Sequence, residues 1–192
     1  MHRRSLLSKL SLVLTLAALP VTVALAHTPY RFWDVFRKRN MVILTSHQDY
    51  TGDDIGDLWV ATLRQNLPLS RALVSRTQDL GRMASLLKTD QVKLAVLSYE
   101  HARQMFAGDA PFESFKPLEL QILVDNGKYL LVTRPDVPLY HGYLVTRGLM
   151  DSAASLKLTD PGTGRHGMVI HPGALAFYKG EKIDPPPPPP DK

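Results

Sequence analysis

The 192-residue sequence contains no cysteine, which excludes a disulfide framework and a thiolate metal site. It also lacks the G-x-S-x-G and H-E-x-x-H motifs, and its glycine-rich stretch over 160–167 lacks the Lys-Ser/Thr pair of a phosphate-binding loop. We therefore expect a protein that is not an enzyme. A chain without disulfides must rest on its hydrophobic core, and the roughly 165 residues after the first 26 suffice for one such core.

Long apolar runs are scarce, and the longest lies near the N-terminus. Three basic residues precede a largely apolar run over 10–19, and small residues follow at 24–26. This order predicts a secretory signal peptide over 1–26 with cleavage after Ala26, and hence export to the periplasm. An uncleaved membrane anchor is the alternative, but a spanning helix needs about 20 apolar residues and Pro20 interrupts this run. We expect no membrane span after cleavage.

The excess of positive charge depends mostly on the predicted signal peptide. The whole chain has 23 basic and 18 acidic residues, a formal net charge of +5. The first 26 residues include three basic and no acidic residues, so the remainder has 20 and 18, a net charge of +2. This balance does not indicate nucleic acid binding.

Composition divides the rest of the chain into three parts. Residues 27–40 are aromatic and basic, and we expect a short leader segment that packs on the domain. Residues 41–182 are expected to form a single α/β lobe, and residues 183–192 a proline-rich disordered tail. The run Pro185–Pro190 favours a polyproline II segment about 19 Å long, at roughly 3.1 Å per residue. It is interpreted as a solvated tail, with a docking ligand for a partner as the alternative.

Hydrophobic periodicity in the first half of the lobe alternates between strand and helix. Strands are expected at 41–46, 71–77 and 91–98, and helices at 55–68, 79–90 and 99–108. Asp53 or Asp54 is expected to cap the first helix. The alternation predicts an α/β fold, a single doubly wound, mostly parallel sheet flanked by helices on both faces.

The pattern changes in the second half. Two strands, 118–125 and 128–134, flank Asn126-Gly127, a strong hairpin signal. A pair of strands that leave the domain and return is the alternative. One helix is expected over 141–156, weakened by two internal glycines, and a last helix follows the His-Pro-Gly turn at 171–173.

Two polar loops follow the first and third predicted strands. Ligands of open α/β sheets bind beyond the carboxyl ends of the strands, where helix N-termini direct amide groups outward. The sequence therefore predicts a shallow site for a small molecule, an organic acid or anion, in the loops over 46–51 and 98–101. The candidate residues are Ser46, His47, Asp49, Tyr50, Thr51, Ser98, Tyr99 and Glu100. The alternative is that the Ser, Asp and Thr side chains only cap helices.

A copper site is a further possibility. Cleavage after Ala26 leaves His27 as the first residue, and its α-amine and imidazole could chelate one copper ion. A second imidazole would complete the site, with His47 as the first candidate; the other candidates are His141, His166 and His171. The acidic residues at 49, 53, 54 and 57 lack the order of an EF-hand calcium loop, and acids at a helix start complement the helix dipole.

Three segments carry a resemblance to a known family. They are "ASLLKTDQVKLAVLS" (84–98), "GYLVTRGLMD" (142–151) and "IHPGALAFYKG" (170–180). Together they resemble the TAXI-type solute-binding proteins of TRAP transporters, within the type 2 periplasmic binding proteins, and the last segment is the most specific. The resemblance implies that the loops after the first and third strands contribute to a solute site.

This chain departs from the family in length. Family members have two lobes that close on a ligand by a hinge. Here six residues, "PDVPLY" (135–140), occupy the place where the second lobe would be, so the chain resembles the first lobe alone. A small-molecule half-site is one interpretation. The alternatives are a non-catalytic accessory module that docks on a periplasmic protein complex, self-association that rebuilds a cleft, and copper binding through His27.

Overall fold

A computed structural model describes residues 40–186 except 117 and 166. The predicted signal peptide, the predicted leader up to residue 39 and the end of the proline-rich tail lie outside the described residues. None of the helices in the described part of the chain has the length and apolarity that a bilayer-spanning segment needs.

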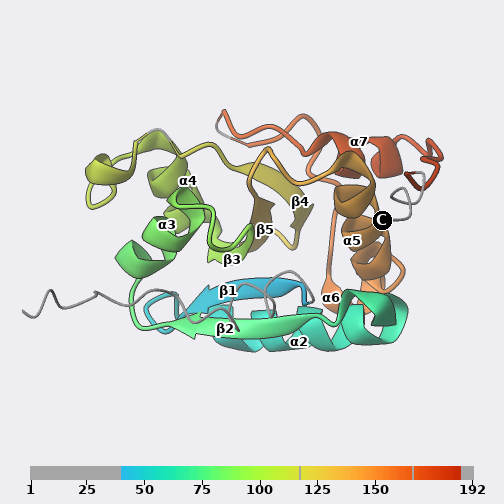
Figure 1. Cartoon of the computed structure of the whole chain (residues 1–192), viewed down its shortest axis with the longest axis horizontal. Helices are drawn as coiled ribbons and strands as arrows, with labels where there is room; N and C mark the ends of the chain where they lie inside the picture. The colour runs from blue at the N-terminus through green and yellow to red at the C-terminus, as the bar shows by residue number, and fades with distance from the viewer. Residues whose placement is uncertain (1–39, 117, 166, 187–192) are drawn as a thin grey trace, which may run out of the picture.

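Five strands form one sheet in the order β2-β1-β3-β5-β4. Their bounds are β1 Val42–Ser46, β2 Leu73–Thr77, β3 Leu94–Ser98, β4 Gln121–Asp125 and β5 Tyr129–Thr133. β1 pairs in parallel with β2 and β3, whereas β5 pairs antiparallel with both β3 and β4. Four strands therefore run in one direction and β5 runs against them (Figure 1). The predicted single, mostly parallel sheet is confirmed.

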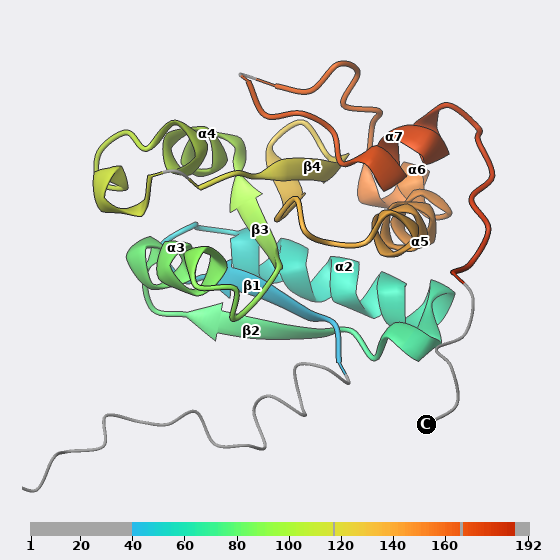
Figure 2. The ribbon, with the colours of Figure 1, turned by 45° about the horizontal axis from the view of Figure 1, so that its top comes forward.

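Helices cover both faces of this sheet. Their bounds are α2 Gly52–Asn66, α3 Leu80–Lys88, α4 Tyr99–Ala107, α5 Leu139–Met150, α6 Ala153–Leu156 and α7 Pro172–Tyr178, with short 3-10 turns η1 Pro68–Ser70 and η2 Glu113–Phe115. Strand residues alternate between two cores: Leu44 packs with α3 and α4, and Ile43 packs with α2, α5, α6 and α7. Figure 2 shows these two groups of helices on opposite sides. The alternation follows from the two-residue repeat of a strand.

β4 and β5 form the hairpin that Asn126-Gly127 predicts. Gly127 has a φ of 86°, and the Asn126 side chain accepts a hydrogen bond from the Tyr129 amide at 2.6 Å. The alternative, two strands that leave the domain and return, is wrong. The single helix predicted over 141–156 is also wrong, because the chain breaks at 151–152 into α5 and α6. Asn66 of α2 donates to the Gly148 carbonyl at 2.8 Å and thereby satisfies a group at the end of α5.

The C-terminal segment returns to the edge of the sheet and then packs on α5. The Ile122 amide donates to the Val169 carbonyl and the His171 amide to the Ile122 carbonyl, both at 2.9 Å. Two buried glycines then permit close contact between helices. A Cβ at Gly142 would lie 2.2 Å from the His171 ring, and one at Gly173 would lie 2.0 Å from a backbone oxygen of α5. The internal glycine that weakens the helix signal at 142 is required by tertiary packing.

His171 is 1% exposed and both of its ring nitrogens have partners. Nδ1 accepts a hydrogen bond from the Gly173 amide at 3.1 Å, so Nε2 carries the proton that is donated to the Val137 carbonyl at 3.0 Å. The side chain therefore caps α7 and joins it to the segment that precedes α5.

Gly173→Ala is expected to destabilise the protein by about 3 kcal/mol. The new Cβ would lie 2.0 Å from the Leu139 carbonyl oxygen and 2.6 Å from the Tyr143 nitrogen, and backbone atoms cannot move aside cheaply. Gly81→Ala is the matched control, because its Cβ meets only one side-chain oxygen, that of the N-cap Asp79, at 3.2 Å. This change should alter stability by less than about 1 kcal/mol. Urea unfolding measures both changes, and equal effects would contradict the packing argument.

The buried imidazole of His171 should make stability dependent on pH. Burial lowers its pKa, and the hydrogen bond to the Val137 carbonyl opposes that shift. The unfolded chain, with a histidine pKa near 6.5, then takes up a proton that the folded chain does not. The free energy of unfolding should therefore fall as the pH is lowered from about 7 to about 5. His171→Gln should flatten this slope in urea titrations; an unchanged slope would assign the dependence to other groups.

Candidate functional site

The two predicted loops meet at one edge of the sheet. From β1 the strand order continues to β2 on one side and to β3 on the other, so the carboxyl ends of β1 and β3 form a topological switch point. The loops 46–51 and 98–101 follow these two ends. Because β5 is antiparallel, its first residue reaches the same edge, where Tyr129 is paired with Ser98.

Asp49 joins the two loops. Its side chain is fully buried, with 0% exposed. One carboxylate oxygen accepts the Ser98 backbone amide at 2.6 Å, and the other lies 2.7 Å from Nδ1 of His101. A buried carboxylate is stable only with such partners. The loop after β1 is thereby fixed to the start of α4.

The same contacts determine the orientation of the His101 ring. Its Nδ1 lies 2.7 Å from the Asp49 carboxylate and 2.9 Å from the Ser98 hydroxyl. Because a carboxylate can only accept, Nδ1 must carry a proton. Among the residues that the structure describes, none hydrogen bonds to Nε2, and the side chain is 25% exposed. The contacts at Nδ1 therefore fix the His101 ring and leave Nε2 as a polar group at the surface of the site.

Tyr129 and Thr51 each add a hydroxyl group to this edge. The Tyr129 hydroxyl donates to the Asp49 backbone carbonyl at 3.1 Å and lies 2.9 Å from the Thr51 hydroxyl. Thr51 and Ser98 occupy the N-cap positions of α2 and α4, yet neither side chain makes a capping hydrogen bond. The alternative that these hydroxyls only cap helices is wrong. We use the term carboxyl-edge site for Asp49, Thr51, Ser98, His101 and Tyr129.

The acidic start of α2 lies beside this site, and its Asp53 carboxylate has several partners. Asp53 pairs with His47 at 2.6 Å and with Arg76 at 3.7 Å, and it accepts the Thr45 hydroxyl. Asp54 lies with Asp53 inside the first turn, so neither is the predicted cap. Among the described residues, no group of three or more His, Asp or Glu side chains could hold a metal ion.

The remaining predicted residues point elsewhere. Ser46 is buried and its hydroxyl accepts the Gln48 amide at 3.3 Å. Tyr50 has a φ of 47° and a side chain that is 88% exposed. Glu100 pairs with Arg103 on its own helix at 2.9 Å, and this hydrogen bond lowers the pKa of Glu100. None of these three side chains contacts the Asp49–His101 pair.

Tyr99 belongs to a second contact at the same edge. Its ring lies 5.3 Å from the Arg165 guanidinium, whose Nε is 2.7 Å from the buried carboxylate of Asp125. The other oxygen of Asp125 accepts the Gly127 amide at 2.6 Å. This ion pair connects the 160–168 loop to the β4–β5 turn and leaves no free charge on Asp125.

The candidate copper ligands that the structure describes do not come together at one site. His27 and His166 lie outside the described residues. His47 pairs with Asp53, and His141 lies at the opposite edge of the sheet. His171 is wrong as a candidate, because both of its ring nitrogens are engaged. Copper binding through His27 and His47 stays a prediction.

Sequence reasoning identified Asp49, Thr51 and Ser98, but it missed the roles of His101 and Tyr129. His101 lies within the predicted loop, and a histidine three residues after the serine that precedes the helix was the available signal. Tyr129 gave none, because the hairpin signal shows that β4 and β5 pair without showing that β5 also pairs with β3.

Tyr129→Phe is expected to cost about 1 kcal/mol of unfolding free energy, because it removes a buried hydroxyl that binds the Asp49 carbonyl and the Thr51 side chain. Tyr50→Phe is the matched control, since the Tyr50 side chain is 88% exposed and should change nothing measurable. Thermal or urea unfolding of both variants tests this. A neutral Tyr129→Phe would show that the hydroxyl does not hold the loop.

No protein-family model, no curated protein and no solved structure matches this chain.

Proposed function

We propose that this protein is an exported, non-catalytic solute-binding protein whose carboxyl-edge site binds a small organic acid or anion. The observation that carries the proposal is the Asp49–His101 pair, 2.7 Å apart, at the switch point of the sheet. The resemblance to TAXI-type solute-binding proteins supports it, because that resemblance implies a solute site in the same two loops. Export rests on the predicted signal peptide.

The chemistry of the site suits an anionic oxygen ligand. When protonated, the His101 ring donates from Nε2 while Nδ1 stays on the Asp49 carboxylate. The first turn of α4 has no side-chain cap; its Tyr99 amide donates to the Lys128 carbonyl at 2.9 Å, and the Glu100 and His101 amides follow beside that ring. Because the Tyr129 hydroxyl donates to the Asp49 carbonyl, the Thr51 hydroxyl donates to Tyr129 and keeps its own oxygen as an acceptor. These groups together can bind a carboxylate and discriminate its orientation.

Three acidic side chains near the site have ionic or hydrogen-bonding partners. The Asp53 carboxylate is paired with His47 and Arg76, and the Glu100 carboxylate with Arg103. The Asp49 carboxylate is buried beneath the His101 ring and accepts the Ser98 amide. A carboxylate that is paired with a cation repels an anionic ligand less than an unpaired carboxylate does.

A second candidate is docking of a protein partner on the same edge. Tyr50 extends from the loop after β1 with 88% of its side chain exposed and a φ of 47°. Tyrosine is enriched at protein interfaces, since it buries a large area at small entropic cost. In this case the partner, rather than a solute, would cover the His101 ring.

A panel of small organic acids, amino acids and inorganic anions, screened by thermal shift and then by calorimetry, tests the solute proposal. His101→Gln should weaken binding of the acid that binds by about tenfold or more, equal to about 1.4 kcal/mol. His141→Gln is the matched control, an exposed histidine at the opposite edge of the sheet, and should leave the affinity unchanged.

Three outcomes would decide between the candidates. No shift with any acid would reject the solute proposal. Binding that His141→Gln weakens and His101→Gln does not would place the ligand at the other edge. A specific protein complex lost in Tyr50→Ala, with no response to acids, would support the docking candidate.

A further inference from the structure

A second feature lies at the edge of the sheet opposite the carboxyl-edge site. A pocket of about 820 Å³ is formed where β1 and β3 begin, between the end of α2, the turn η1 and helix α5. Its apolar wall includes Met41, Leu67, Leu69, Val92, Leu144 and Val145. We use the term amino-edge pocket for this cavity. Its size falls in the range of about 300–1,000 Å³ that is typical of ligand and docking sites.

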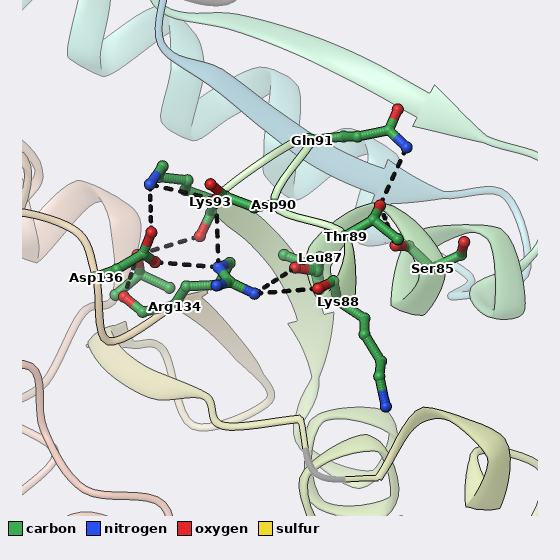
Figure 3. Close-up of polar contacts among 10 residues, drawn as sticks. Ser85, Leu87, Lys88, Thr89, Asp90, Gln91, Lys93, Arg134 and Asp136 are labelled. Atoms are coloured by element: carbon green, nitrogen blue, oxygen red, sulfur yellow. Dashed lines mark hydrogen bonds and ion pairs between the residues drawn. The ribbon is translucent and has the colours of Figure 1, made fainter.

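Four charged side chains near this pocket are paired with one another. Figure 3 shows Lys93 between the carboxylates of Asp136 and Asp90, and Arg134 beside the same two carboxylates. Arg134 also donates to the Leu87 carbonyl at 2.8 Å, at the end of α3. This cluster has two positive and two negative groups, so it leaves no net charge to attract an ionic ligand. The pocket is therefore suited to an apolar occupant.

The rim of the pocket exposes apolar surface that a partner would cover. Leu69, within η1, is 93% exposed, the most exposed large apolar side chain among the described residues. An apolar side chain so exposed beside an apolar pocket suits contact with an apolar partner. The occupant must supply side chains of matching apolar character.

The chain itself supplies such a segment next to the pocket. The described structure begins at Asn40, which lines the pocket, and Met41 is fixed there because its amide donates to the Ser70 carbonyl at 3.0 Å. The 13 preceding residues, "HTPYRFWDVFRKR" (27–39), include Phe32, Trp33 and Phe36. Phe36 is four residues from Asn40, so it cannot lie farther than about 14 Å from that wall.

The tether makes this segment a strong competitor for the pocket. A short linker gives an effective concentration in the millimolar range, which a free small molecule in the surroundings seldom reaches. Aromatic side chains bring large apolar areas to such a site. A second copy of the chain could supply the same residues, but only at the much lower concentration of the protein in solution.

We propose that residues 27–39 of this chain dock in the amino-edge pocket of the same molecule, with Phe32, Trp33 and Phe36 against its apolar wall. This proposal does not depend on the solute proposal, because the two sites lie at opposite edges of the sheet. It gives the aromatic leader a structural role, since the leader would fill the amino-edge pocket.

Tryptophan fluorescence of the full chain tests the proposal. The chain has two tryptophans, and the difference between wild type and Trp33→Phe isolates the emission of Trp33. We expect this emission to be shifted to the blue and protected from acrylamide. Leu69→Asp alters the rim at a side chain that is 93% exposed, so the fold should persist while Trp33 becomes severalfold more quenchable. Val169→Asp, 54% exposed and not part of the pocket lining, is the matched control and should leave Trp33 protected.

Binding of the apolar dye ANS provides a second readout. Wild type should bind ANS weakly, and replacement of Phe32, Trp33 and Phe36 by serine should create one strong site by opening the pocket. If Trp33 in wild type is quenched as freely as a tryptophan in a short peptide, the proposal is overturned. Equal, stoichiometric ANS binding by wild type and the serine variant would also overturn it, in favour of a small apolar ligand. Protection of Trp33 that disappears on dilution would assign the pocket to a second copy of the chain.

Discussion

The buried carboxylate of Asp49 connects the parts of the molecule on which the proposed function depends. It accepts the Ser98 amide and holds the His101 ring, and its own backbone carbonyl accepts the Tyr129 hydroxyl and the Gly52 amide. Groups from β3, β5, α2 and α4 therefore converge on one residue. An acid at 0% exposure is stable only if each of its oxygens has a donor, so these elements must keep their relative positions.

A second constraint acts on the other side of the sheet. α7 approaches α5 so closely that glycine is required at 142 and 173, and the buried His171 ring fills the space beside Gly142. The segment before α7 also pairs with β4 through the backbone of Ile122 and therefore covers an otherwise unpaired edge. The His-Pro-Gly turn that carries the family resemblance is thus a packing device. In the described structure it holds α7 against α5.

The two edges of the sheet present contrasting chemistry. The carboxyl edge gathers hydroxyls, a histidine and helix N-termini, whereas the amino edge forms an apolar pocket with a neutral cluster of paired charges. The helix N-termini at the carboxyl edge follow from the fold, because the parallel strands β1 and β3 lead there directly into α2 and α4. A polar solute and an apolar chain segment could therefore occupy one lobe without competition.

Local sequence patterns determined the strands, the helices, the hairpin and the two-faced character of the sheet. Each of these depends on the spacing of apolar residues within one segment or on the turn preference of Asn-Gly, and such information lies within a few residues. Tertiary structure alone decided that β5 lies between β3 and β4, that Asp49 meets His101, and that α5 ends before residue 151. These outcomes depend on contacts between residues far apart in the chain. Asn66 reaches Gly148, for example, and periodicity within a segment cannot specify which distant side chain will satisfy a given carboxylate or carbonyl.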